Sequence, residues 1–476
     1  MNLSGIFGRM VALIGAVTVL LRRREGGAHE PAWGSAPAIP AARPQGIPTL
    51  KMPTARGWAQ GQTPVAAPGL KVNAFATGLK HPRWIYVLPN GDVLVAEALT
   101  VVGSIKTVFD YAMFSTMERA AAAGVSPNRI TLLRDTDGDG VADRIERFGR
   151  GDVDTGLAIH DGSVYFSSAV AIYAVPLDSG LVPSAEPELV AGGFEDSGGG
   201  HTAKPITFDA EGHLYTQAGV PSNSCQQQDR APGSRGHDPC PQLERFGGVW
   251  RFIANGREQE QLTDGIRYST GHRNVVALEW NPLANRLFLV MHGRDQLDTL
   301  WPEHFTAAER SELPAEEFHV VDQGADLGWP YTYYDQQRGA RMISPEYGGD
   351  GATAAERGKY QDPLIGFPGH WAPNDLVFYT GAQFPEEYRG GAFIAFHGSW
   401  NRDTQDGYSV VFVPMSGADV AGDWRVFADG FEGPEPIASP ADAVHRPSGL
   451  AQGPDGSLYI SDDVGGRIWK VTYTGN

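Results

Sequence analysis

The chain has 476 residues, of which 41% are hydrophobic and 20% charged, the composition of an ordinary globular protein. Its 60 glycines and 34 prolines are typical of a chain with many tight turns, which favours an all-β protein. A formal net charge of -18 repels nucleic acid and anionic membrane surfaces, so we expect no nucleic-acid partner.

The N-terminus contains an apolar run from Met10 to Leu21, which has the length of a signal-peptide core and is short for a membrane span. Three arginines follow this run and only Arg9 precedes it, the reverse of the usual signal-peptide order. Residues 1–26 are therefore predicted to be a signal peptide or an N-terminal membrane anchor, with the protein exported to the periplasm or anchored facing it. Residues 27–69 are rich in Ala, Pro and Gly without hydrophobic periodicity, which predicts a disordered tether.

From Leu70 onward a polar turn with Gly or Asn, followed by a short strand of apolar and small residues, occurs six times. The copies begin at Leu88, Ile159, Phe208, Asn281, Tyr388 and Gly453. Each predicts a hairpin, so residues 70–476 are predicted to form an all-β, six-bladed β-propeller. A β-sandwich or two unrelated β domains is the alternative, but the strand from Arg467 ends the chain where a ring would close. Only 109–124 and 305–317 are expected to be helical.

Two polar segments are candidates for a cross-link and a metal. Cys225 and Cys240 cannot complete a four-thiolate zinc site, so we expect a local disulfide in an oxidising compartment; two free thiols are the alternative. The segment DTDGDGVADRIE fits the ligand pattern of an EF-hand calcium loop, but its flanks are strand-like rather than helical. It is either a structural calcium turn or an acidic hairpin without metal. Its ligands would be Asp135, Asp137, Asp139, Asp143 and Glu146.

Six further segments occur in order along the repeat region. They are HPRWIYVLPNGDVLVAEA from His81, GGGHTAKPITFDAEGHLYTQAG from Gly198, GHRNVVALEW from Gly271, DLGWPYTY from Asp326, AFHGSWNR from Ala395, and HRPSGLAQGPDGSLYISDD from His445. Together they resemble the quinoprotein sugar dehydrogenases of the soluble glucose dehydrogenase type, particularly the sorbosone dehydrogenase branch. The resemblance implies a propeller that binds pyrroloquinoline quinone (PQQ) and calcium, oxidises a sugar, and passes electrons to an external cytochrome or quinone.

The resemblance assigns roles to five residues in the middle of the chain. His201 follows three glycines, and a histidine is suited to take a proton from a sugar hydroxyl at neutral pH, so it is the implied general base. Arg273 and Asn274 are expected at the cofactor, where Arg273 offsets the charge of the reduced quinone; a surface ion pair is the alternative for Arg273. The main-chain carbonyls of Gly293 and Arg294 are expected to hold the cofactor's calcium, although Arg294 stands where the family has proline.

Further cofactor contacts are implied at His397, Trp400, Arg402, Arg446 and Arg83. The segment AFHGSWNR lacks the lysine of the glucose-oxidising members, so Arg402 is expected to supply that charge and Trp400 to stack on the quinone. Arg446 matches one of two family arginines that bind the cofactor's carboxylates, while Ser448 replaces the second. Arg83 is expected to point into the central channel.

The implied reaction is hydride transfer from the substrate carbon to a quinone carbonyl carbon, giving a lactone or an acid. Two other functions fit the same pattern. A calcium-dependent lactonase or esterase would need side-chain oxygens that converge on one axial calcium. Its candidate ligands are Asn223, Asn274, Asp295, Asn374, Asp375 and Asp462. The other alternative is a carbohydrate- or protein-binding propeller without catalysis.

Overall fold

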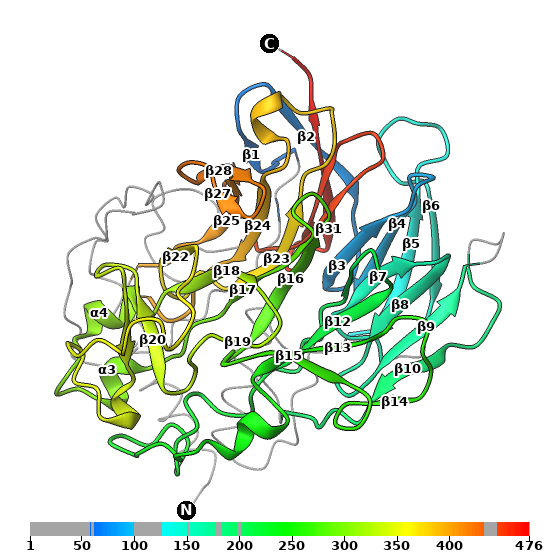
Figure 1. The fold of residues 1–476 in the computed structure, drawn as a ribbon. Coiled ribbons are helices and arrows are strands. Elements are labelled where there is room, and N and C mark those ends of the chain that lie inside the picture. Colours follow the sequence, from blue (N-terminus) through cyan, green and yellow to red (C-terminus); the bar gives the residue numbers. More distant parts are fainter. Residues whose placement is uncertain are drawn as a thin grey trace, which may run out of the picture.

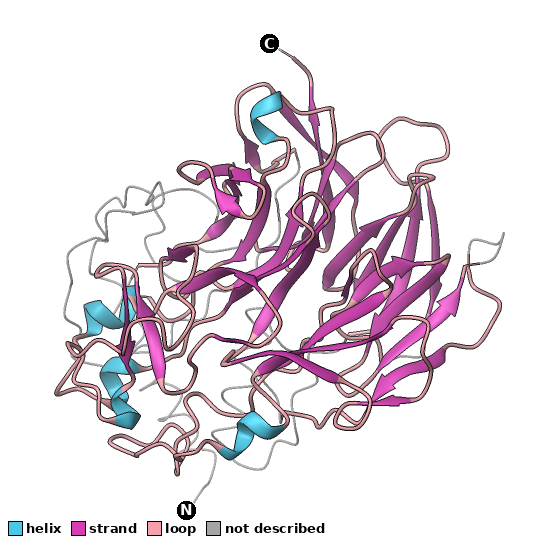
Figure 2. Ribbon diagram, in the orientation of Figure 1, coloured by secondary structure: helices cyan, strands magenta, loops and turns pink. Residues whose placement is uncertain are grey.

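Six antiparallel sheets are arranged in a ring in the computed structural model (Figure 1). The structure describes residues 58, 61–99, 126–149, 152–177, 182–197, 201–402, 404–432 and 445–475. Each sheet has four or five strands, and its first strand contacts the first strand of a neighbouring sheet. Helices are few and short among the described residues (Figure 2). The chain is a six-bladed β-propeller, and this prediction is confirmed.

The blades follow one another along the chain. Blade 1 contains β3 (Pro82–Val87), β4 (Val93–Glu97), β5 (Arg129–Arg134) and β6 (Arg144–Phe148). Blade 2 contains β7 (Leu157–His160), β8 (Ser163–Ser167), β9 (Ile172–Pro176), β10 (Glu188–Gly192) and, in parallel, β14 (Gln259–Glu260). Blade 3 contains β11 (Thr207–Phe208), β12 (His213–Ala218), β13 (Gly248–Ile253), β15 (Ile266–Thr270) and, in parallel, β19 (Ala325–Asp326).

The second half of the ring has the same order. Blade 4 contains β16 (Val275–Asn281), β17 (Arg286–Met291), β18 (Glu316–Val321) and β22 (Ile365–Phe367). Blade 5 contains β23 (Pro373–Phe378), β24 (Ala392–His397), β25 (Tyr408–Val413), β28 (Arg425–Asp429) and β1 (Val65–Ala66). Blade 6 contains β29 (Pro447–Gln452), β30 (Leu458–Asp462), β31 (Arg467–Tyr473) and β2 (Leu70–Ala76). Two hairpins, β20 (Thr332–Asp335) with β21 (Ala340–Ile343) and β26 (Met415–Ser416) with β27 (Asp419–Val420), extend the loops.

The hydrophobic core lies between the blades. Six separate clusters of buried side chains occupy the six interfaces between neighbouring sheets. Because each sheet packs on both faces, strands such as AFIAFH and YSVVFV are buried along their whole length. This explains why these strands read as continuous apolar runs rather than as an alternating pattern.

The ring is closed by a strand from the beginning of the described chain. β2 pairs antiparallel with the last strand, β31, from Leu70 opposite Tyr473 to Ala76 opposite Ile468. Described residues also precede Leu70, the predicted start of the propeller: β1 pairs with β28, with Val65 opposite Asp429. The predicted signal peptide or anchor, residues 1–26, lies outside the described residues.

The helical predictions had different outcomes. The segment 109–124 lies outside the described residues. In 305–317 only α4 (Ala307–Glu312) is helical, started by a capping box at Thr306, and the chain enters β18 at Glu316. α4 lies with α3 (Leu297–Leu300) at one side of the ring (Figure 1). No helix in the described part of the chain is both long and apolar enough to cross a membrane.

Candidate active site

The topology brings most of the predicted residues to one face of the ring. Successive strands of a blade are antiparallel, so the segment that enters the first strand and the loop that leaves the second lie at the same end of the sheet. The residues in such positions are His201 before β11, Arg273 before β16, Arg446 before β29, Arg83 at the start of β3, His292 after β17, and His397 at the end of β24.

His201 is held in a single tautomer. Its Nδ1 atom lies 2.6 Å from the carbonyl oxygen of Val220, in the segment that follows β12. Since a carbonyl only accepts, Nδ1 donates and Nε2 keeps its lone pair. Burial, followed by the charge of Arg273, lowers the pKa of His201 to about 3, so the imidazole is neutral at pH 7. A Cβ atom at Gly219 would lie 2.4 Å from the His201 carbonyl oxygen, which explains the glycine in this contact.

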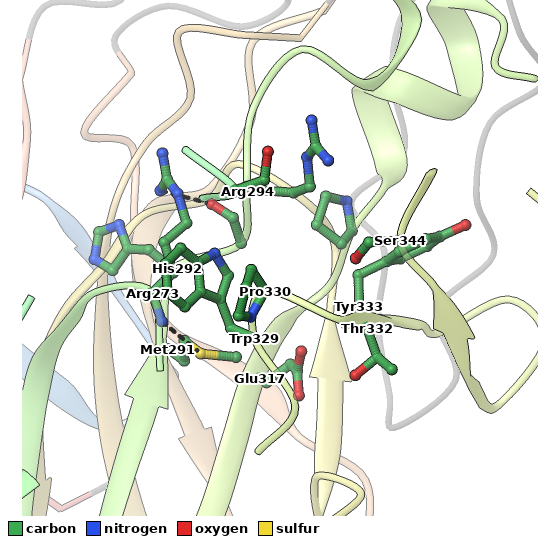
Figure 3. Close-up of a pocket in the computed structure, with 13 residues that line it drawn as sticks. Arg273, Met291, His292, Arg294, Glu317, Trp329, Pro330, Thr332, Tyr333 and Ser344 are labelled. Atoms are coloured by element: carbon green, nitrogen blue, oxygen red, sulfur yellow. Dashed lines mark hydrogen bonds between the residues drawn. The ribbon is translucent and has the colours of Figure 1, made fainter. Parts of the chain in front are cut away.

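Arg273 is buried, and both terminal nitrogens of its guanidinium donate to oxygen atoms, whereas its Nε has no hydrogen-bond partner among the described residues. Its Nη1 donates to the carbonyl of Gly293 at 2.8 Å (Figure 3), and its Nη2 donates to Asp295 at 2.8 Å and to Asn223 at 3.2 Å. Burial raises the pKa of the Asp295 carboxyl, but the charges of Arg273 and Arg230 outweigh it and hold that pKa well below its usual range. The Arg273–Asp295 pair is thus a fixed, charged element beside the imidazole of His201.

The main-chain positions predicted to hold calcium lie beside Arg273. The Gly293 carbonyl accepts a hydrogen bond from the Arg273 guanidinium, which leaves it a second lone pair. The side chain of Arg294 forms a buried ion pair with Glu346 at 2.5 Å. Both arginines line the pocket of Figure 3, with Trp329 and Pro330. Calcium at the Gly293 and Arg294 carbonyls stays a prediction.

A second cluster forms around Arg446. Its guanidinium carbon lies 4.9 Å from the ring centroid of Trp400, and its Nη1 lies 3.4 Å from Nδ1 of His397. Nε2 of His397 lies 3.0 Å from both carboxylate oxygens of Asp463, which also pairs with Arg83 at 3.2 Å. The structure therefore brings together four of the five further predicted cofactor residues, Arg83, His397, Trp400 and Arg446, from blades 1, 5 and 6.

The two clusters belong to one site. Nε2 of His292 donates to the carbonyl of Pro373 at 2.7 Å, and the neighbouring residue Ala372 accepts from the backbone of His397 at 2.8 Å. Burial, together with the charges of Arg273 and His397, lowers the pKa of His292 to about 4, although the hydrogen bond to Pro373 acts in the opposite direction. His292 thus lies between the Arg273 and Arg446 clusters.

Two predicted residues have other surroundings. Arg402 does not join Arg446, because its guanidinium donates to the Glu312 carboxylate and to the carbonyls of Ser311 and Gly369. This enclosed ion pair makes it a link between loops, which corrects the prediction that it replaces the missing lysine. Asn274 follows Arg273 directly and is buried, with its Oδ1 3.5 Å from Nε2 of Gln217.

Two acids of the site were not predicted as partners of its arginines. The sequence indicated Asp295 only as a candidate lactonase ligand and gave Asp463 no role. The acidic pair at 462–463 directly after β30 was the available signal. The three acidic residues among the candidate lactonase ligands do not converge on one cation. Asp295 pairs with Arg273, Asp375 accepts the backbone N–H of Leu450 at 2.7 Å, and Asp462 accepts from the Trp58 indole and from the backbone N–H of Arg446. This arrangement disfavours the lactonase alternative.

Buried polar atoms without a hydrogen-bond partner indicate which kind of ligand the site would bind. Among the described residues, Nη2 of Arg446, Oγ of Ser448 and Nε1 of Trp400 are buried without a hydrogen-bond partner. Buried donors are normally satisfied, so this set suits a ligand that carries acceptor oxygens. A guanidinium beside an indole ring matches a flat, carboxylate-bearing group. The residues present therefore fit PQQ.

Two other clusters of metal-ligand types lie in turns away from this site. Asp135, Asp137 and Asp139 approach one another between β5 and β6, but Asp135 already accepts the backbone N–H groups of Gly138 and Gly140. The predicted ligand Asp143 accepts from Thr136, and Glu146 accepts from Arg144 at 3.3 Å. Calcium at this turn stays a prediction.

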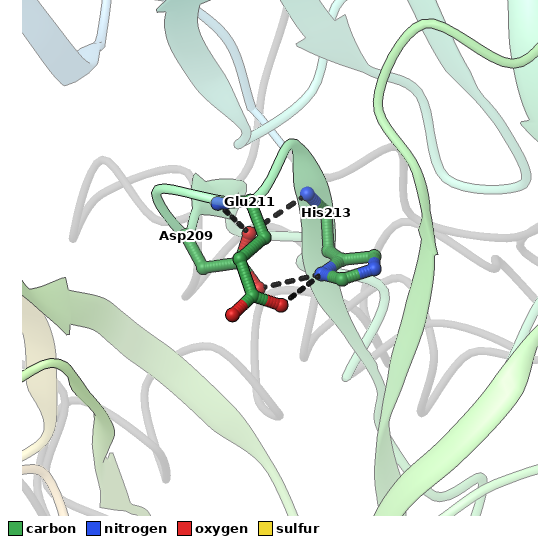
Figure 4. A group of neighbouring side chains, drawn as sticks. All are labelled: Asp209, Glu211 and His213. Atoms are coloured by element: carbon green, nitrogen blue, oxygen red, sulfur yellow. Dashed lines mark hydrogen bonds and ion pairs between the residues drawn. The ribbon is translucent and has the colours of Figure 1, made fainter.

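The second cluster contains Asp209, Glu211 and His213 in the turn between β11 and β12 (Figure 4). The carboxylate of Asp209 accepts from Nδ1 of His213 at 2.7 Å and from the hydroxyl of Tyr215 at 2.9 Å. These hydrogen bonds stabilise the hairpin of β11 and β12, which explains why the three side chains lie together.

The predicted disulfide is confirmed between Cys225 and Cys240. The two cysteines are buried with Val220 and Trp329 in one small hydrophobic cluster. The disulfide-closed loop, residues 225–240, therefore begins directly beside the segment that orients His201.

Comparisons with known proteins identify the family of the chain. The family described as TrAA12-like matches residues 64–474. The chain belongs to the TrAA12-like family. One curated relative, a pyrroloquinoline quinone-dependent pyranose dehydrogenase of Coprinopsis cinerea, is 28% identical over 174 residues, 30% of this chain and 22% of the relative. The chain spans about half the length, or less, of the first curated relatives that it matches.

Solved structures support the fold of this family member. The calcium structure of the Trichoderma reesei family AA12 carbohydrate-active enzyme has a TM-score of 0.64 and 20% identity, covering 86% of this chain and 97% of that chain. The holo form of the PQQ domain of the Coprinopsis cinerea pyranose dehydrogenase has a TM-score of 0.63 and 17% identity, covering 88% and 98%. At these identities the likeness shows the fold alone.

Proposed function

We propose that this protein is a PQQ-dependent sugar dehydrogenase, which oxidises a sugar CH–OH or aldehyde group. The observation that carries the proposal is the pairing of a neutral, single-tautomer histidine, His201, with the fixed guanidinium of Arg273 on the same face as Arg446. Membership of the TrAA12-like family and the name of the Coprinopsis cinerea relative support it.

The chain's own residues supply acid–base and electrostatic functions. Nε2 of His201 accepts the proton of the hydroxyl group that is oxidised, because Nδ1 is committed to Val220. Arg273, kept charged and oriented by Asp295, offsets the negative charge that develops beside it. When bound, PQQ supplies the two-electron oxidant that takes the hydride from the substrate carbon.

The second cluster has a binding function. Arg446, with one unpartnered Nη2 atom and a neighbouring indole ring, would hold a cofactor carboxylate and the flat ring system. Asp463, ion-paired with Arg83 and hydrogen-bonded to His397, would fix the two groups that surround Arg446. His397 and Arg83 would thus act on the cofactor site through the Asp463 carboxylate that they share.

The product of the reaction follows from this chemistry, and the cellular compartment is inferred from the disulfide. Oxidation of a cyclic hemiacetal gives a lactone, and oxidation of a hydrated aldehyde gives an acid. The electrons then leave to an external cytochrome or quinone. The disulfide suits an oxidising compartment, which supports export or anchoring toward the periplasm.

Reconstitution tests the proposal. The purified protein is incubated with PQQ, with and without calcium, and dye-linked oxidation is measured for a panel of aldoses and sorbosone. Oxidation that depends on PQQ supports the dehydrogenase. Hydrolysis of a lactone with calcium alone, with no PQQ binding, would overturn it.

A further inference from the structure

The segment that leaves β12 touches all three groups of the proposed proton-transfer centre. The Val220 carbonyl accepts from His201 at 2.6 Å, and the Val220 N–H donates to the Arg273 carbonyl at 3.0 Å. The side chain of Asn223 accepts from Arg273 at 3.2 Å and from the backbone of Asp295 at 2.9 Å. Its Nδ2 also donates to the Asp295 carbonyl at 2.9 Å. This segment continues directly into the disulfide-closed loop.

The loop makes its own contacts with the same centre. Arg230 donates to the Asp295 carboxylate at 3.2 Å and to the side chain of Gln296. The Asn223 carbonyl accepts from the indole N–H of Trp329 at 3.1 Å, and Trp329 packs in the same cluster as the two sulfur atoms. The Cys240 N–H donates to the hydroxyl of Tyr331 at 2.9 Å. The disulfide therefore closes the loop next to the contact between Asn223 and Trp329, and Arg230 of the same loop binds Asp295.

Exposure changes along this row of residues. The side chain of Arg273 is 6% exposed, that of Asp295 is 21% exposed and that of Arg230 is 42% exposed. The row leads from the buried centre to the solvent, so Arg230 of the loop is the solvent-exposed end of the contacts that hold the Arg273–Asp295 pair.

We propose that the disulfide-closed loop is a positioning element of the active site. Arg230 in the loop and Asn223 in the segment that enters it fix Asp295, and Asp295 in turn fixes the guanidinium of Arg273 beside His201. This inference rests on the proposed function for its catalytic consequence, but the ordering of residues 292–296 by the loop is independent of PQQ.

Two variants and one control test the inference. The Cys225→Ala/Cys240→Ala double variant releases the loop, and Arg230→Ala removes the exposed contact alone. Arg257→Ala is the matched control, because this half-exposed arginine pairs with Glu188 at 2.6 Å at the outer edge of blade 2. Amide hydrogen exchange of residues 292–296 is measured in the protein without PQQ. The dissociation constant of PQQ, kcat, KM and Tm are measured alongside.

We expect exchange of residues 292–296 to accelerate by about tenfold in the double variant, because the loop no longer holds Asn223 against Asp295. A misplaced Arg273 should then lower kcat/KM by about 10- to 100-fold. PQQ affinity should change by less than about threefold, since the Arg446 cluster is untouched. Arg230→Ala should lower kcat/KM by a smaller factor, and Arg257→Ala should match the unaltered protein.

Two results would overturn the inference. One is unaltered exchange of residues 292–296 in Arg230→Ala and, if it folds, in the double variant. The other is a loss of kcat/KM that follows Tm equally in all three variants, which would make the disulfide a global staple only. If the unaltered protein binds no PQQ, the proposed function fails, while the exchange measurement still decides whether the loop orders Asp295.

Discussion

Nδ1 of His201 donates to the carbonyl oxygen of Val220 across 2.6 Å. This contact fixes Nε2 as the basic atom, and burial together with the charge of Arg273 lowers the pKa of His201 to about 3. Folding therefore keeps neutral an imidazole that would be protonated below pH 6.5 in the unfolded chain. The stability that depends on this group is present above about pH 6.5 and is lost as the pH falls toward the folded-state pKa.

The first prediction concerns this histidine. In the protein without cofactor, the His201 imidazole should stay neutral down to about pH 4 in an NMR titration. A negatively charged ligand beside Arg273 offsets the charge that lowers the pKa, so PQQ binding should raise it. A His201 resonance that titrates near pH 6.5 without cofactor would contradict the burial described here.

The second prediction concerns Glu316, which lies behind the Gly293 peptide. Its carboxylate accepts the N–H groups of Gly293 at 2.8 Å and Ala372 at 3.2 Å, while burial raises its pKa to about 7. A carboxyl group with a raised pKa binds its proton more tightly when folded, so its contribution to stability declines as the pH rises from about 4.5 through 7.

We therefore expect a transition near pH 7 in the pH profile of kcat/KM that disappears in Glu316→Gln. Glu211→Gln, a change at an exposed turn, is the control and should keep the transition. A profile that is identical in both variants would show that Glu316 does not affect the Arg273 side of the site.

The third prediction concerns Trp58. Its indole N–H donates to Asp462, and its ring stacks on His445 with centroids 3.9 Å apart. Asp462 also accepts the backbone N–H of Arg446 at 3.2 Å. Trp58→Ala should weaken PQQ binding by about tenfold, a cost of about 1.4 kcal/mol. Trp58→Phe retains a ring without the donor, so its affinity for PQQ should lie between those of the unaltered protein and Trp58→Ala. Unchanged affinity in both variants would refute a role of Trp58 in positioning Arg446.

The fourth prediction concerns Arg446. Because a planar guanidinium that lies over an indole ring is not replaced by an ammonium group, Arg446→Lys should weaken PQQ binding by about 10- to 100-fold. Arg425→Ala is the control, since Arg425 also lies over aromatic rings, 4.9 Å from Tyr388 and Phe412, but on the outer strand β28. Fluorescence titration with PQQ measures both; equal losses would contradict a specific contact at Arg446.

Repetition made the fold predictable. The hairpin signals at Leu88, Ile159 and the four later copies each mark one blade, so the number of blades could be read without any long-range information. The start of the ring was harder, because β1 has only the residues Val65–Ala66 and gains its order by pairing with β28. A pairing between distant segments leaves little local signal.

The site was predictable where a side chain has a motif around it. His201, Arg273 and Arg446 lie in segments with a recognisable pattern, and the structure places them on one face. Gly293 and Arg402 were assigned by position alone, and their contacts depend on residues distant in the sequence, Arg273 for Gly293 and Glu312 for Arg402. The same reason explains why Asp463 was missed: its role comes from Arg83 and His397, which are distant in the sequence.

The most direct test of the central claim is single-turnover reduction of bound PQQ by an excess of aldose, followed by absorbance in the unaltered protein and in His201→Gln. The account predicts that both proteins bind PQQ with similar affinity and that the rate of reduction falls by about 10²- to 10⁴-fold in the variant, because its proton acceptor is lost. Equal rates in the two proteins, or no reduction by any sugar of the panel in the unaltered protein, would contradict it.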